Sequence, residues 1–155
     1  MSDIPLIKAS DPRDLAARDL IARHLALMAA TSPEESVHAL KIDELAKDGV
    51  SFYASFEHDT AISIGAFQFI EPKHAELKSM HVRDTHRGRG LARAMLDHLL
   101  EKATQAGATR ISLETGTASQ FHPARVLYAR AGFVTCPPFG AYVEDPHSVF
   151  MTRAT

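Results

Sequence analysis

The sequence predicts an α/β fold whose central sheet contains antiparallel strands and one parallel pair. Two apolar-rich stretches joined by a short turn predict an antiparallel hairpin. Farther along the chain, a strand, a helix and a second strand follow one another, and such a crossover is right-handed and makes its two strands parallel. The predicted strands are 4–9, 50–56, 60–70, 75–82, 109–115, 133–136 and 148–152.

Apolar spacing and terminal signals predict the helices. Leu91, Met95 and Leu99 recur every four residues, which is the spacing of one helix face, and a glycine follows the last turn. Asp11 can cap an earlier helix with Pro12 at its first position. The predicted helices are 12–30, 32–47, 91–106 and 121–131, and the break at 31–35 between the first two is expected to form the rim of a substrate mouth.

The strand at 75–82 changes the side on which its apolar residues fall. Ala75 and Leu77 are odd-numbered, whereas Met80 and Val82 are even-numbered. Because successive side chains of a strand alternate between faces, such a change requires an extra residue. The pattern therefore predicts a β-bulge around 78–80, with an irregular strand end as the alternative.

Length and composition favour one domain, 1–155, of ordinary globular type. Of its 155 residues, 45% are hydrophobic, and the formal net charge is −2, which gives no global affinity for nucleic acid or for an anionic membrane. The sequence shows no signal peptide and no apolar run long enough to cross a bilayer. A single cysteine, Cys136, excludes an internal disulfide, and we expect a cytoplasmic location.

Basic residues and glycines gather where the predicted strand 75–82 turns into the next helix. Gly88 and Gly90 place no side chain between the backbone and a ligand, and a helix start exposes N–H groups that attract phosphate. His86, Arg87 and Arg89 add positive charge. The nucleoside-triphosphate P-loop pattern is missing, and the segment instead fits R-x-x-G-x-A. A simple turn and an RNA-contacting patch are the alternatives.

Taken together, the motifs of this chain resemble the GNAT superfamily of N-acetyltransferases. The segment 76–106 resembles the acetyl-CoA-binding core, and Ala124-x-x-Leu127-Tyr128-x-x-x-Gly132-Phe133 resembles the signature of a later helix. The stretch 137–151 is similar to a subgroup of small bacterial acetyltransferases. The resemblance spans 4–152, with one departure: Phe121 stands where an asparagine often precedes the later helix, which removes the usual side-chain contact to pantetheine.

This resemblance implies the GNAT fold: a mixed, mostly antiparallel sheet, helices on both faces, and a parallel pair splayed at a β-bulge. It also implies acetyl-CoA as co-substrate, with the pantetheine arm in the gap and the pyrophosphate on the glycine loop. The predicted acetyl-CoA contacts are Met80, His81, Val82, Arg87, Gly88, Arg89, Gly90, Leu91, Ala92, Pro123, Arg125 and Tyr128.

Acetyl transfer requires a base for the amine, an acid for the departing thiolate and a donor to the thioester carbonyl. A backbone N–H of Met80 or Val82 can polarise the carbonyl. Tyr128 is the predicted acid, with simple packing as the alternative. Glu76 is the favoured base, and the alternative for it is an ion pair with Lys78 or Lys73. Glu114 is the competing carboxylate, and His81 is a third candidate for the base.

For the acceptor, a primary amine of a small molecule or peptide, we expect contacts from Phe139 and Tyr142. The break at 31–35 and the loop at 137–145 are the two irregular stretches expected to flank the acceptor. Their acidic residues favour a cationic acceptor; they are Glu34, Glu35, Glu144 and Asp145. The scattered histidines show no metal-ligand spacing, so no metal is predicted. The sequence does not decide between a monomer and a homodimer. The alternative functions are a coenzyme A-binding regulatory module without catalysis and, with less support, an RNA-binding protein.

Overall fold

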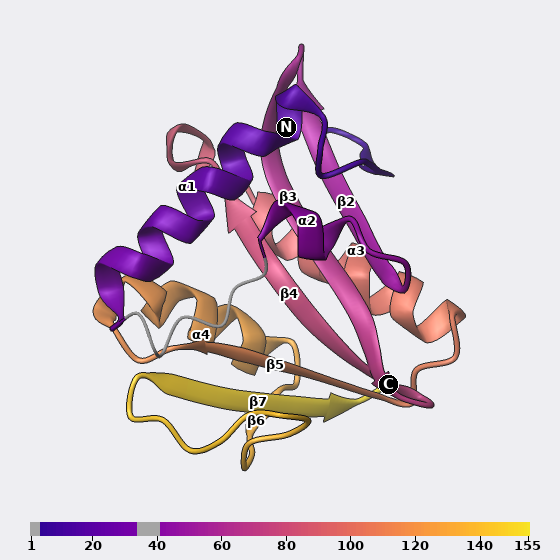
Figure 1. Cartoon of the computed structure of the whole chain (residues 1–155), viewed down its shortest axis with the longest axis vertical. Helices are drawn as coiled ribbons and strands as arrows, with labels where there is room; N and C mark the ends of the chain where they lie inside the picture. Colours follow the sequence, from indigo (N-terminus) through magenta and orange to yellow (C-terminus); the bar gives the residue numbers. More distant parts are fainter. Residues whose placement is uncertain (1–3, 34–40) are drawn as a thin grey trace.

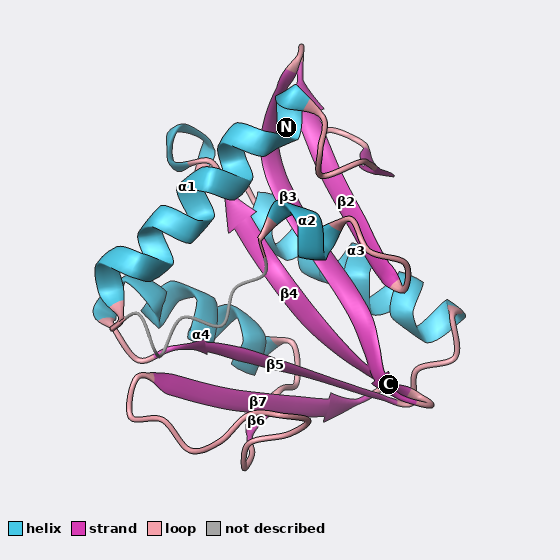
Figure 2. Ribbon diagram, in the orientation of Figure 1, coloured by secondary structure: helices cyan, strands magenta, loops and turns pink. Residues whose placement is uncertain are grey.

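The computed structural model describes residues 4–33 and 41–155, which form a seven-stranded mixed sheet (Figures 1 and 2). The strand order is β1-β2-β3-β4-β5-β7-β6, and β4 with β5 is the parallel pair within it. The strands are β1 (Ile7–Ala9), β2 (Val50–Glu57), β3 (Thr60–Glu71), β4 (His74–Val82), β5 (Arg110–Gly116), β6 (Val134–Thr135) and β7 (Ser148–Ala154). The predicted fold class is confirmed.

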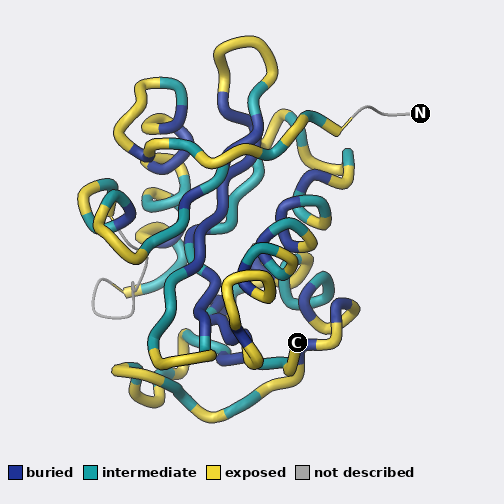
Figure 3. Tube along the Cα trace, turned by 90° about the vertical axis from the view of Figure 1, so that its right-hand side faces the viewer, coloured by how far each residue is buried: buried dark blue, intermediate teal, exposed yellow. Residues whose placement is uncertain are grey.

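Helices cover both faces of the sheet, as Figure 3 shows from the side. On one face, Leu20 and Ile21 of α1 pack against Ile64 of β3. On the other face, Met95 and Leu99 of α3 belong to the core with strand and α4 residues. The helices are α1 (Leu15–Thr31), α2 (Ile42–Leu45), α3 (Leu91–Gln105) and α4 (His122–Arg130), with 3₁₀ turns η2 (Asp84–His86) and η3 (Ser119–Phe121).

The N-terminal third differs most from the predicted boundaries. The helix α1 begins at Leu15 because the Asp11 carboxylate accepts a hydrogen bond from the Arg13 N–H within a turn, and Asp14 becomes the N-cap. Of the predicted helix 32–47, residues 34–40 lie outside the described part of the chain. Its described helical portion is the single turn α2, which ends before Ala46.

The predicted bulge is present in β4. Ile64 stands opposite His81 and Ala66 opposite Lys78, so Gly65 faces two residues, Ser79 and Met80. Ser79 has φ = +57°, a left-handed backbone conformation. A Cβ at Gly65 would lie 2.8 Å from Met95 Cγ, so α3 packs directly on the β3 backbone beside the bulge.

Beyond the bulge, the parallel pair separates. The register joins His74–Leu77 to Arg110–Leu113 and ends there, while both strands continue. We call these paired residues the closed half, and the continuations 78–82 and 114–116 the splayed half.

Candidate active site

A cavity of about 90 Å³ occupies the splayed half and is lined from both faces of the sheet. His24 and Met28 come from α1, whereas Phe121 and Tyr128 come from η3 and α4 on the opposite face. Tyr142, from the loop between β6 and β7, completes one wall. Two molecules that approach from opposite faces can therefore meet between β4 and β5.

The glycine-rich loop directly follows the splayed half of β4. Gly88 and Gly90 have φ = +81° and +80°, which favours glycine, and Gly90 is the N-cap of α3. A Cβ at Gly88 would meet no atom within 4 Å, and at Gly90 the nearest is Ile4 Cδ1 at 3.8 Å. Behind this open backbone, Leu91 is buried and anchors the helix start, and Ala92 stands in the first turn. The loop fits an anion on the N–H groups of α3.

An acidic residue of β2 contacts the basic side chains of this loop. Glu57 accepts a bond from His86 Nε2 at 3.1 Å and from Arg89 Nη1 at 3.3 Å. The His86 hydrogen bond, followed by that of Arg89, lowers the pKa of Glu57. Arg87 is exposed at the loop surface. The hairpin end thus balances part of the positive charge that the sequence places here.

Backbone N–H groups of β4 face the gap. Arg83 N–H donates to the Ile62 carbonyl of β3 at 2.8 Å. Because N–H directions alternate along a strand, those of Val82 and Met80 point to the other edge, where β5 has diverged. A carbonyl-polarising role for either amide stays a prediction.

The His81 side chain points away from this edge and into the layer under α1. Its Nδ1 lies 3.2 Å from Nδ1 of His24. Burial lowers the pKa of His24 to about 3, assisted by His81, and burial lowers the pKa of His81 to about 4, assisted by Arg87. His81 therefore packs with its side chain under α1. Of this residue, only the backbone is left for the predicted acetyl-CoA contact.

Tyr128 is buried, with 8% of its surface exposed, and lies on the α4 side of the cavity. Its hydroxyl is directed at Met80 Sδ at 3.8 Å, and its ring packs edge-on against Phe133. Burial, with a smaller effect of the Glu114 charge, raises the pKa of Tyr128 to about 12. The phenol therefore stays protonated at neutral pH and can donate a hydrogen bond into the cavity.

Two of the predicted catalytic carboxylates line the same cavity in different surroundings. Glu76, 4% exposed, accepts a hydrogen bond from Tyr142 OH at 2.5 Å and forms an ion pair with Lys78 Nζ at 3.1 Å. Glu114 is the first β5 residue beyond the closed half, and it accepts a hydrogen bond from Ser148 Oγ at 2.8 Å. The pairing of Glu76 with Lys78 was the alternative foreseen from sequence.

The loop between β6 and β7 brings both predicted acceptor residues onto the sheet. The ring centroids of Phe139 and Tyr142 are 5.3 Å apart, and each ring contacts Phe150 of β7. Burial and the neighbouring Glu76 charge raise the pKa of Tyr142 well above its usual range. These aromatic side chains extend the cavity wall on the α1 side of the sheet.

The last two predicted acetyl-CoA contacts lie on α4. Pro123 is exposed in its first turn. Arg125 Nη1 donates to the carbonyl oxygens of Gly116 and Ala118, at 2.6 and 3.2 Å, and so braces the loop that leads into α4. A phosphate contact from either residue stays a prediction.

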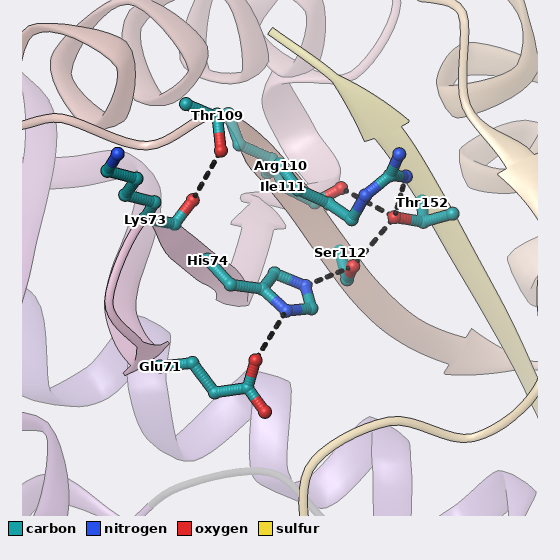
Figure 4. Close-up of polar contacts among 8 residues, drawn as sticks. All are labelled: Glu71, Lys73, His74, Thr109, Arg110, Ile111, Ser112 and Thr152. Atoms are coloured by element: carbon teal, nitrogen blue, oxygen red, sulfur yellow. Dashed lines mark hydrogen bonds and ion pairs between the residues drawn. The ribbon is translucent and has the colours of Figure 1, made fainter.

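Polar side chains of the closed half are bonded to one another (Figure 4). His74 Nε2 lies 2.7 Å from Ser112 Oγ, which lies 2.8 Å from Thr152 Oγ1. Arg110 donates to the same threonine at 3.1 Å, and the Glu71 carboxylate lies 3.9 Å from His74 Nδ1. This network crosses three strands, β4, β5 and β7, below the point where the gap opens.

Sequence reasoning missed the α1 contribution to the cavity. His24 and Met28 fall on the apolar face of the predicted helix, and that pattern does not distinguish a core position from a cavity wall. Within the described residues, no group of three or more His, Cys, Asp or Glu side chains is arranged to hold a metal ion. No helix in that part of the chain is long and apolar enough for a membrane span.

The strand order, the parallel pair that separates at a bulge, and the glycine loop before α3 are the features that the resemblance implies for an acetyltransferase. The chain belongs to the acetyltransferase (GNAT) family, whose model matches residues 17–133. It is 40% identical over 147 residues to the Bacillus subtilis protein YsnE, named as an N-acetyltransferase, covering 95% of this chain and 97% of that one. It is therefore an acetyltransferase of a family that uses acetyl-CoA.

Solved structures share the fold. A structure described as an acyl-CoA N-acyltransferase from Klebsiella pneumoniae aligns with a TM-score of 0.78 at 30% identity, covering 97% of both chains. A Bacillus subtilis acetyltransferase in complex with CoA aligns with a TM-score of 0.71 at 16% identity, covering 97% of this chain and 99% of that one. The second likeness concerns the fold alone.

Proposed function

We propose that the enzyme transfers the acetyl group of acetyl-CoA directly to a primary amine of a small molecule or a peptide, within the gap between β4 and β5. The observation that carries this proposal is the cavity of about 90 Å³ that both faces of the sheet line. The thioester arm would enter from the side of α3 and α4, and the amine from the side of α1. The two would meet without a covalent enzyme intermediate.

The residues present fit acetyl-CoA. The open backbone at Gly88 and Gly90 leads into the first N–H groups of α3, where the pyrophosphate would be held. The N–H groups of Met80 and Val82 would bind carbonyl oxygens of the arm and of the acetyl group. Arg87, exposed beside the loop, would supply charge for a phosphate.

The atoms balance in one displacement. The lone pair of the neutral amine forms a bond to the acetyl carbon, and the carbon–sulfur bond breaks with its electron pair passing to sulfur. Before this attack, Glu114 takes the proton of the acceptor's ammonium form, which makes the amine neutral, and it later releases that proton to solvent. Tyr128 donates a proton to sulfur and is reprotonated by the proton that the nitrogen loses on acetylation. The high pKa of Tyr128, about 12, keeps this proton in place until charge develops on sulfur.

We assign the base to Glu114 rather than to Glu76. Lys78 Nζ at 3.1 Å and the Tyr142 hydroxyl both contact the Glu76 carboxylate and hold it in place. Glu114 stands where the strands separate. Glu76 would then position the aromatic loop. For the acceptor, carboxylates at Glu144 and Asp145 in that loop favour a cationic amine; Glu34 and Glu35 lie outside the described residues.

The test is turnover of acetyl-CoA against amines, amino acids, polyamines, aminoglycosides and peptide N-termini, followed by release of free thiol. We expect at least one cationic amine to be acetylated. A folded protein that binds acetyl-CoA and acetylates none of them would support a regulatory module instead. On a good acceptor, Glu114→Gln should lower kcat about 10²-fold at neutral pH and recover as rising pH deprotonates the amine. Glu76→Gln is the matched variant. If kcat fell at neutral pH and recovered at high pH only in Glu76→Gln, the base would be Glu76 and not Glu114.

A further inference from the structure

One residue of the cavity wall carries a hydroxyl that the chemistry described above does not use. Ser79 is 9% exposed, it lines the cavity, and its buried Oγ has no hydrogen-bond partner among the residues that the structure describes. A buried hydroxyl without a partner destabilises the folded state. This group is therefore poorly explained by folding alone.

The backbone of Ser79 carries a second cost. Its φ of +57° lies in the left-handed region, which glycine adopts with far less strain than other residues. A serine here combines backbone strain with an unsatisfied hydroxyl at one position of the bulge. Such coincidences gather at ligand-binding and catalytic sites.

The position of Ser79 in the bulge narrows its role. Both Ser79 and Met80 stand opposite Gly65, so the serine directly precedes the residue whose N–H faces the gap. Tyr128 lines the cavity with them, and its hydroxyl points at Met80 Sδ. The serine hydroxyl is thus close to the backbone amide expected at the thioester carbonyl, and that carbonyl oxygen has two lone pairs to accept from two donors.

We propose that Ser79 is a further catalytic residue, whose hydroxyl donates a hydrogen bond to the carbonyl oxygen of the bound acetyl thioester beside the Met80 N–H. This inference rests on the proposed function. The bond strengthens as negative charge develops on that oxygen during amine attack, so it favours the transition state over the ground state. A hydroxyl that binds an ordered water in the cavity is the competing explanation.

A binding experiment tests this without any acceptor amine. Acetyl-CoA and S-ethyl-CoA, a thioether that lacks the carbonyl, are titrated calorimetrically into wild type, Ser79→Ala and Ser79→Gly. We expect wild type to prefer acetyl-CoA, and in both variants that preference should fall about 3- to 10-fold, the range of one hydrogen bond, because the Met80 N–H still donates. Ser112→Ala, a buried serine of the closed half, is the control and should keep it.

Kinetics on an amine found in the panel give the second readout. One oxyanion donor is worth about 10²–10³ in kcat, and because the Met80 N–H remains, Ser79→Ala should lose about 10- to 100-fold in kcat with little change in KM. Ser79→Gly should lose as much while its Tm rises, because glycine relieves the positive φ. A purely structural serine would instead allow the glycine variant full activity.

The outcomes separate the two proposals. Wild-type binding and turnover combined with unchanged preference and kcat in both Ser79 variants would overturn the role of Ser79 and leave the proposed function standing. Equal wild-type affinity for the two ligands would also overturn it. If wild type binds neither ligand, the proposed function fails first, and the Ser79 inference fails with it.

Discussion

The closed and splayed halves of the β4–β5 pair differ in how their polar groups are satisfied. In the closed half, His74 and Ser112 bond across the strands and onward to β7 (Figure 4). In the splayed half, β5 is no longer paired with β4, the N–H groups of Met80 and Val82 point away from β3, and Ser79 Oγ is buried without a partner among the described residues. The closed half holds the sheet together, and the splayed half leaves donors available for a substrate.

The cause of this difference is one extra residue. With one extra residue opposite Gly65, the bulge bends β4 next to the point where its pairing with β5 ends, while β5 continues to Gly116. The fold tolerates the bulge because α3 packs against the flat backbone of Gly65 on the neighbouring strand. The comparison teaches that a gap can open within a sheet without removing any strand.

Tyr128→Phe should show the largest effect. It removes the hydroxyl that we propose as the proton donor from the wall of the cavity and keeps the ring packed on Phe133. We expect kcat to fall about 10²–10⁴-fold with acetyl-CoA affinity nearly unchanged, measured by steady-state kinetics and calorimetry. In the closed half, Ser112→Ala should keep kcat and lose about 1 kcal/mol of unfolding free energy in urea titrations. Equal kcat losses in the two variants would remove the distinction between the halves.

Gly90→Asp should weaken acetyl-CoA binding about 30-fold, or about 2 kcal/mol. The change loses a favourable helix-end interaction of up to about 1 kcal/mol and adds a comparable repulsion between carboxylate and phosphate. Gly107→Asp is the matched control, since Gly107 has φ = +106° at the opposite end of α3 and a Cβ there meets no atom within 4 Å. If calorimetry shows the same affinity in both variants, the loop does not hold the pyrophosphate.

The His24–His81 pair should make the protein less stable in mild acid. Both folded-state pKa values, about 3 and 4, lie below the unfolded value of 6.5. The unfolded chain therefore binds more protons below pH 6.5, so stability is complete above that pH and is lost as the pH falls towards 4. By pH 5 the loss should be about 2 kcal/mol for each histidine.

Urea titrations at pH 7 and pH 5 check this expectation. His24→Phe should reduce the pH dependence of the unfolding free energy, because only His81 of the pair can then bind a proton on unfolding. His122→Gln, at an exposed position, is the control. Identical pH slopes for wild type and His24→Phe would show that the pair is not buried in its neutral form.

Local patterns were enough to predict the gap, whereas its walls depend on long-range contacts. The parity change between Leu77 and Met80 revealed the bulge, because a strand has a strict period of two. The glycine loop could also be predicted from local sequence, because its glycines and basic residues directly precede a helix start. The hydrogen bond from Tyr142 to Glu76 joins residues 66 positions apart through an irregular loop, and no periodicity encodes it.

The same limit applies to charge. Sequence reasoning assigned His86 and Arg89 to the anion loop, and the structure brings Glu57 from the adjacent hairpin end to both of them. Likewise, Arg125, a predicted acetyl-CoA contact, bonds to two loop carbonyls that its motif does not encode. Side-chain partners set by tertiary packing are invisible to motif spacing, even where the motif itself is correctly placed.

Amide hydrogen exchange, followed by NMR with and without acetyl-CoA, tests most directly whether the splayed half receives the thioester. We expect acetyl-CoA to slow exchange at Met80, Val82 and the first amides of α3, since their N–H groups would donate to the ligand. Exchange at His74–Leu77 should not change, because that half is already bonded to β5. Protection confined to the closed half, or unchanged exchange at Met80 and Val82 under saturating acetyl-CoA, would contradict the site described here.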